Sequence, residues 1–360
     1  MKIIKILPYG FLGNLQSIAA LIGFKPFEYR ENTVLLLEPY DVHGEVIPGL
    51  VKYLLDLGYN VDVIISMTGR GRNDTSLFSS FEKNDKVRVK SMAGYKINRL
   101  LRTSPLKHYK HIIINSFYDK DINFYKVDLF KLKPVCMLHN PNITEPYFKT
   151  NKIISLVKMD CINREPPLVV NSHYFGDITK SNKSETTTFI AFNSKNLFRR
   201  NLHLLFRACD ALYKKKINNF CVKIIGKGIA IPPVYRDNFL VFESLNFKQM
   251  FDEVSKSDFL LGLIDAASVE YANKASGSFQ LSYGFSKPII LHSKFGGNSG
   301  FTNDNSVLHD SNDSLASAME NCINMSENDY SLMVAELEKT EKQLYKDSLN
   351  NLKRAMEEDL

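Results

Sequence analysis

The sequence has no tryptophan, and its five cysteines are scattered along the chain at Cys136, Cys161, Cys209, Cys221 and Cys322. Their spacing matches no pattern of metal ligands, and several of them lie inside apolar segments. Buried reduced thiols are the usual state of such residues in a cytoplasmic protein. We therefore expect no disulfide, no zinc and no other bound metal.

The sequence also lacks an apolar run long enough to cross a membrane. Its most apolar segment near the start, residues 11–24, is interrupted by Asn14, Gln16 and Ser17. It falls short of the ~20 residues that a spanning helix needs. The residues after it form a poor cleavage site for a signal peptide. We expect an interfacial helix or an ordinary buried helix here, in a cytoplasmic protein.

Charge is unevenly distributed along the 360 residues, whose net charge is +7. Between residues 70 and 110 the bases outnumber Asp74, Glu82 and Asp85. The bases are Arg70, Arg72, Lys83, Lys86, Arg88, Lys90, Lys96, Arg99, Arg102, Lys107 and Lys110. An anionic membrane leaflet, a lipid diphosphate, nucleic acid and plain solvation are all compatible with such a patch. Because no motif interleaves stacking aromatic residues, we expect contact with the membrane surface and no nucleic acid.

Apolar segments of the first half are continuous, which is typical of parallel strands buried on both faces. They lie at residues 33–37, 61–66, 111–115, 135–138 and 168–171. Residues 47–55 have the three- and four-residue apolar spacing of a helix, so the first two strands and this helix form a βαβ unit. The predicted fold class is therefore α/β with doubly wound parallel sheets.

Ligands of such sheets bind beyond the carboxyl ends of the strands, so the polar loops there are candidate sites. Gly44 and Glu45 follow the first strand, Asp119 follows residues 111–115, and His139 follows residues 135–138. We expect Glu45 or Asp119 to act as a base where the chemistry needs one, and His139 to contact substrate.

A second strand–helix–strand unit spans Ala191 to Gly228 and has an unusually basic turn. Lys195 and Arg200 stand just before the helix, where free backbone amides already favour an anion. Gly226 follows the second strand of the unit. This arrangement is suited to a diphosphate.

This segment resembles the start of the donor half of GT-B nucleotide-sugar glycosyltransferases, especially the retaining family that builds bacterial envelope polysaccharides. In that family an Arg at the strand end and a Lys five residues later clamp the donor diphosphate. Lys195 stands at the Arg position here and Arg200 at the Lys position. The resemblance implies two Rossmann-like domains facing a cleft. Gly44 stands where members have a glycine that approaches the donor, and His139 stands at a strand end where many members have a histidine.

The stretch from Tyr271 to Leu291 carries the same resemblance. Ser276, Gly277 and Ser278 stand at a predicted helix start, whose amides and hydroxyls are suited to phosphate or ribose. A strand follows Lys287 and Pro288, as in the family's Gly-Lys-Pro motif. Asn273 and Leu281 replace the family's two glutamates, so the stereochemical outcome of the transfer stays open. Ser278 or Gln280 would then contact the ribose in place of the missing glutamate.

We expect an acceptor-binding domain over residues 1–180, a donor-binding domain over residues 181–340 and a terminal helix over residues 341–360. The resemblance implies transfer of a sugar from a nucleotide diphosphate sugar to a lipid-linked envelope glycan, without a cofactor. A metal is not required where Lys195 and Arg200 neutralise the leaving diphosphate. The alternatives are a nucleotide-sugar epimerase of the same fold and a non-catalytic module that binds polyanions or membranes.

Overall fold

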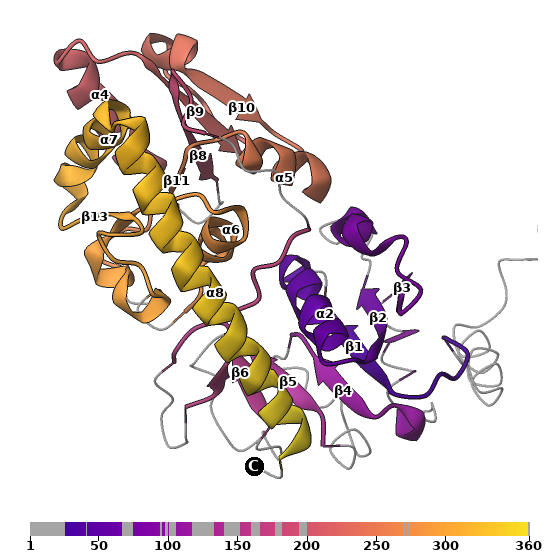
Figure 1. Ribbon diagram of the computed structural model, residues 1–360. Coiled ribbons are helices and arrows are strands. Elements are labelled where there is room, and N and C mark those ends of the chain that lie inside the picture. The colour runs from indigo at the N-terminus through magenta and orange to yellow at the C-terminus, as the bar shows by residue number, and fades with distance from the viewer. Residues whose placement is uncertain are drawn as a thin grey trace, which may run out of the picture.

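The chain forms two parallel sheets that belong to different halves of the sequence (Figure 1). The computed structural model describes residues 26–40, 42–66, 75–93, 96–97, 100, 106–116, 133–139, 152–159, 166–176, 182–193, 200–268, 271 and 274–358. Residues 11–24, Asp119 and Lys195, for which the sequence makes predictions, lie outside this part.

The first sheet defines the N-terminal domain and has the strand order β3-β2-β1-β4-β5-β6-β7. Its strands are β1 (Thr33–Glu38), β2 (Asn60–Ser66), β3 (Val87–Met92), β4 (His111–Ile114), β5 (Val135–Leu138), β6 (Ile153–Ser155) and β7 (Leu168–Val169). Leu36 packs into the core on one face of β1, and Leu35 and Leu37 pack on the other. This burial on both faces explains why the strands have continuous apolar sequences.

The second sheet defines the C-terminal domain and has the order β10-β9-β8-β11-β12-β13. Its strands are β8 (Thr187–Phe192), β9 (Phe220–Ile225), β10 (Phe239–Phe242), β11 (Phe259–Leu261), β12 (Ile289–His292) and β13 (Val307–His309). In both sheets the strand order reverses direction beside the first strand of the domain. The prediction of two doubly wound parallel sheets is confirmed.

Helices pack against both sheets because each has an apolar face. They are α2 (Ile47–Asp56), α4 (Leu202–Lys214), α5 (Phe247–Ser255), α6 (Gly277–Phe285), α7 (Leu315–Asn324) and α8 (Glu327–Glu357). Helix α8 runs along both domains in Figure 1. Its Tyr330 and Leu337 pack into the C-terminal domain, and Leu352 packs into the N-terminal domain.

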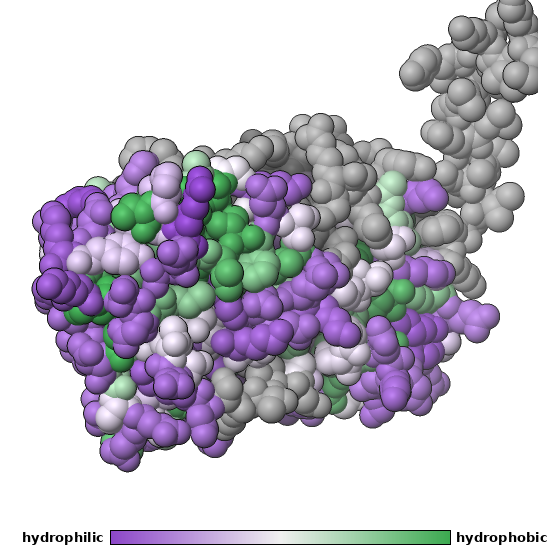
Figure 2. Space-filling view, turned by 90° about the horizontal axis from the view of Figure 1, so that it is seen from above, coloured by the Kyte–Doolittle hydropathy of each residue, from purple (hydrophilic) through white to green (hydrophobic). Residues whose placement is uncertain are grey.

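Hydrophilic side chains make up most of the described face in Figure 2, and apolar side chains gather toward its middle. Among the described residues, the large hydrophobic side chains exposed to solvent are Tyr29, Val234, Leu240 and Leu332. No helix in the described ranges is both long and apolar enough to cross a bilayer.

Candidate functional site

The loop after β1 forms the N-terminal wall of a cavity between the two domains. His43 has the left-handed backbone conformation, with φ 55° and ψ 23°, which turns the chain into a short 3-10 helix over Gly44–Val46. The His43 ring stacks on the His139 ring with centroids 4.0 Å apart and planes 9° from parallel. Oε1 of Glu45 lies 3.8 Å from Nδ1 of His43. Two strand-end loops thus place two imidazoles and one carboxylate side by side.

The start of α6 forms the opposite wall. Ser276 occupies the N-cap position, but its side chain does not cap the helix. Instead its Oγ accepts a hydrogen bond of 2.9 Å from Nη2 of Arg200, whose Nη1 lies 3.5 Å from the carbonyl oxygen of Gly262. A methyl group added at Gly277 would meet nothing within 4 Å. The first turn of α6 therefore faces open space beside a guanidinium group.

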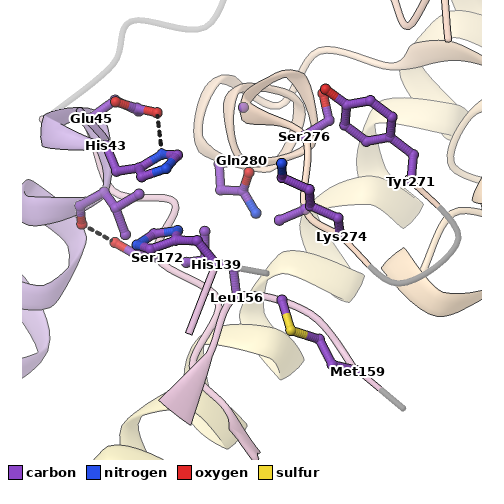
Figure 3. A pocket seen from close by; sticks show the side chains of 13 residues that line it. His43, Glu45, His139, Leu156, Met159, Ser172, Tyr271, Lys274, Ser276 and Gln280 are labelled. Atoms are coloured by element: carbon purple, nitrogen blue, oxygen red, sulfur yellow. Dashed lines mark hydrogen bonds and ion pairs between the residues drawn. The ribbon is translucent and has the colours of Figure 1, made fainter. Parts of the chain in front are cut away.

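The cavity between these walls has a volume of about 130 Å³. Residues of both domains line it: His43, Glu45, Val46, His139, Leu156, Met159, Ser172, Tyr271, Lys274, Ala275, Ser276, Gly277 and Gln280. Figure 3 shows Lys274 and Gln280 reaching from one side toward His43 and His139 on the other. The lining thus combines an ammonium group, a carboxylate, imidazoles and an amide, groups that can bind a polar ligand.

Two polar atoms on α6 are buried and have no hydrogen-bond partner among the described residues. They are Oγ of Ser278 and Nε2 of Gln280, and both side chains are almost completely buried. A buried polar group without a partner costs about 1–3 kcal/mol, so native proteins rarely keep one without a reason. Both atoms can donate a hydrogen bond. A ligand with acceptor oxygens would supply the missing partners.

His139 is held in its neutral form. Burial lowers the pKa of its imidazole well below 6.5, and the nearby His43 and Lys274 lower it further. Its Nε2 lies 2.6 Å from the carbonyl oxygen of Asn115. Because a carbonyl only accepts, Nε2 must carry the proton, and the bare Nδ1 is the acceptor. His139 is therefore suited to accept a hydrogen bond from a hydroxyl group.

Comparison with known proteins identifies the architecture. No protein-family model matches the sequence, and no curated protein matches it. An alpha-glucosyltransferase in complex with UDP-glucose and DNA matches with a TM-score of 0.54 at 13% identity, over 87% of this chain and 94% of that one. The chain has the GT-B fold.

Two further GT-B structures match over nearly their whole length. AviGT4, a glycosyltransferase involved in avilamycin A biosynthesis, has a TM-score of 0.53 at 13% identity, over 90% of this chain and 98% of that chain. Anabaena HepE in complex with UDP has a TM-score of 0.54 at 12% identity, over 90% and 98%. The prediction of the GT-B plan from the sequence is confirmed.

The GT-B cavity brings together residues that the sequence places far apart. Glu45, His139, Ser276 and Gly277 all line it, and Arg200 contacts the lining residue Ser276. Gly44 and Ser278 do not line it themselves, but each is the neighbour in sequence of a residue that does. Gly226 is not among the lining residues, and its N–H donates to the carbonyl of Phe242 at the end of β10. Within the described ranges, no group of three or more His, Cys, Asp and Glu side chains could hold a metal ion.

The predicted site residues do not include His43 and Lys274, two charged or titratable residues that line this GT-B cavity. His43 precedes the predicted pair Gly44 and Glu45, so its place in a strand-end loop was a usable signal. The left-handed conformation that stacks it on His139 is invisible in the sequence. Lys274 reaches the cavity only because the two domains pack together, and no local pattern reveals that.

Proposed function

We propose that this protein is a glycosyltransferase that moves a sugar from a nucleotide diphosphate sugar to a hydroxyl of a glycan acceptor. The observation that carries the proposal is the contact of Arg200 with Ser276 at the start of α6, beside a cavity between two GT-B domains. The similar structures include one that contains UDP-glucose and one that contains UDP, which supports a nucleotide-sugar donor.

The donor diphosphate would lie at the first turn of α6. The free amides there and the open space at Gly277 favour an anion, and the guanidinium of Arg200 adds charge-assisted hydrogen bonds. In this proposal Arg200 and Lys195 stabilise the charge that develops on the leaving nucleotide diphosphate. The protein needs no metal ion for that step.

The sugars would lie between α6 and the stacked histidines. Nδ1 of His139 accepts a hydrogen bond from a sugar hydroxyl, and Nε2 of Gln280 donates one to a sugar oxygen. For a transfer that inverts the anomeric centre, Glu45 takes the proton of the acceptor hydroxyl, and His43 beside it orients the carboxylate. A transfer that retains configuration needs no such base.

For the acceptor we propose a lipid-linked envelope glycan at the inner face of the plasma membrane. Part of the basic region 70–110 is bonded within the domain, since Arg88 donates to the buried Asp62. Lys83, Lys86, Lys107 and Lys110 remain exposed on the N-terminal domain. These lysines are the part of the region that an anionic membrane surface would attract.

The proposal is tested by adding nucleotide diphosphates and nucleotide sugars to the protein and measuring its melting temperature. A ligand that binds only the folded state raises that temperature by mass action. Arg200→Ala should weaken binding of the best ligand by roughly 10- to 100-fold, since a hydrogen bond to a charged group contributes about 1.5–3 kcal/mol. Arg207→Ala is the matched control, because Arg207 is exposed on α4 and pairs with Asp313.

Three outcomes count against the proposal. Binding of none of the nucleotides would reject the donor site, and equal losses in the two arginine variants would remove the clamp at α6. Release of an altered nucleotide sugar without any acceptor would assign the chain to an epimerase instead.

A further inference from the structure

A buried acid lies beneath the N-terminal wall of the cavity, at the carboxyl end of β1. Glu38 has no exposed surface. Its Oε1 accepts from the N–H of Tyr40 at 2.9 Å, and its Oε2 accepts from Nδ2 of Asn115 at 2.6 Å and Oγ of Ser116 at 2.7 Å. Asn115 and Ser116 follow β4, the neighbour of β1 in the sheet. The acid thus joins two strand-end loops at the point where the strand order reverses.

Asn115 connects this acid to both histidines of the wall. Its Nδ2 also donates to the main-chain oxygen of His43 at 3.0 Å, at the residue with the left-handed backbone. Its own main-chain oxygen accepts from Nε2 of His139 at 2.6 Å. One asparagine therefore sets the position of His43 and the tautomer of His139, and Glu38 sets the position of that asparagine.

We propose that Glu38 is a positioning residue, which holds the stacked His43–His139 pair in place through Asn115 without touching the ligand. This inference rests on the proposed glycosyl transfer, since the histidine pair is the part of the wall that would meet the sugars. Glu38 itself lines no part of the cavity.

The hydrogen-bond pattern requires a carboxyl group at this position. The ionised carboxyl group accepts at both oxygens, and here donors approach both of them, so loss of the Glu38 proton completes this pattern. A glutamine has an NH₂ group at one end, which would face either Tyr40 N–H or the NH₂ of Asn115. If the NH₂ group of the glutamine faces that of Asn115, two donors meet. The Asn115 amide must then rotate and present its Oδ1, which has no partner among the described residues. That rotation takes Nδ2 away from the main-chain oxygen of His43.

The surroundings also make Glu38 sensitive to pH. Burial raises its pKa to about 8, the nearby Glu45 adds to the rise, and the hydrogen bonds from Ser116, Asn115 and Tyr40 oppose it. His43 and His139 are the other titratable groups linked to it, through Asn115. Loss of the proton near that pH places a buried anion under the histidine pair.

The test compares Glu38→Gln with Ser116→Ala in steady-state transfer and in nucleotide binding. Glu38→Gln should lower kcat at least ~10-fold, because a displacement of about 1 Å in a catalytic wall can cost ~100-fold. The Kd of the donor nucleotide should stay within about twofold, since the phosphate contacts lie on α6. Ser116→Ala leaves the Asn115 bridge intact and should change kcat less than about threefold.

The pH–rate profile separates positioning from a general loss of structure. In the wild type, kcat should rise as the pH passes about 8, because ionised Glu38 is the form that accepts from Tyr40, Asn115 and Ser116. Glu38→Gln should lack this inflection, since a carboxamide does not titrate. Ser116→Ala should move the inflection to higher pH, because the lost hydrogen bond is one that lowers the pKa of Glu38.

A folded Glu38→Gln variant with unchanged kcat would overturn the inference, and so would an inflection that Ser116→Ala leaves in place. If Glu38→Gln does not fold, the inference is decided by the direction in which Ser116→Ala moves the inflection of the pH–rate profile. A wild type with no transfer activity at all would instead reject the proposed function.

Discussion

At the scale of single residues, the unpartnered amide of Gln280 favours ligand binding at the expense of stability. Replacing Gln280 with leucine removes the cost of burying Nε2 without a partner, while keeping a side chain of similar size. We expect Gln280→Leu to raise the free energy of unfolding of the ligand-free protein by about 1 kcal/mol. Its melting temperature should respond less to a nucleotide sugar than that of the wild type, which thermal-shift measurements with and without ligand will show.

Ser282, on the same helix, provides the control for this prediction. Its Oγ is buried like the amide of Gln280, but it donates a satisfied hydrogen bond of 2.7 Å to the carbonyl of Lys287. Ser282→Ala should therefore lower the stability of the ligand-free protein and leave the ligand-induced shift unchanged. A lower stability of Gln280→Leu without ligand would contradict the prediction.

At the scale of elements, the connection from α6 to β12 contains a buried lysine whose charge opposes folding. Lys287 is 2% exposed, and burial lowers the pKa of its ammonium from 10.5 to about 8 despite the opposing effect of Asp258. Between these two values the unfolded chain binds more protons than the folded chain, so the free energy of unfolding rises with pH. The gain is absent below pH 8 and amounts to at most about 3 kcal/mol by pH 10.5.

Lys287→Met should remove this dependence. We expect the variant to be more stable than the wild type at pH 7, and its advantage should shrink as the pH rises toward 10. Urea unfolding at each pH measures the difference in free energy of unfolding between the two proteins. The contributions of other titrating groups cancel in this difference. A constant difference across this range would show that Lys287 keeps its charge in the folded protein.

Elements were predictable where burial on both faces leaves a continuous apolar sequence. Strand β3 was missed because Arg88 and Lys90 alternate with its valines. At the edge of the sheet, these two side chains contact Asp62 and the main-chain oxygen of Pro26. Strand β6 has only three residues, too few to show a pattern.

The candidate site was predictable to the extent that topology alone brings strand ends together. Glu45 and His139 both lie beside His43 for that reason, and Arg200 contacts Ser276 across the ends of β8 and β11. Glu38 was missed because a carboxylate after an apolar run is read as a turn residue. Its role depends on Asn115, which lies 77 positions away in the sequence.

At the scale of the whole molecule, the segment after β7, residues 170–176, contacts both α8 and the C-terminal domain. Nε2 of His173 lies 2.9 Å from Oε1 of Glu341 on α8, and the N–H of Asn171 donates to Oγ of Ser348 on the same helix. Figure 1 shows α8 extending from one domain to the other. Leu337 and Leu344 pack on the core of the C-terminal domain and Leu352 packs on that of the N-terminal domain, so the helix contacts different domains at its two ends.

Helix α6 lies close to this segment at Gly284. A Cβ atom there would lie 2.2 Å from the carbonyl oxygen of His173 and 2.5 Å from the ring of Phe175. The oxygen belongs to the backbone, so it cannot turn aside as a side chain can. Gly284→Ala should therefore push α6 away from the segment and cost about 1–3 kcal/mol of stability, as overpacking usually does.

Because α6 also carries the cavity wall, this displacement should reach the ligand. We expect Gly284→Ala to weaken donor binding as well as lower the melting temperature. Gly297→Ala is the matched control, since a Cβ at Gly297 meets nothing within 4 Å, and it should change neither quantity by much. If Gly284→Ala is as stable as the wild type, the domains adjust to the added methyl group, and the contact at His173 does not fix their relative position.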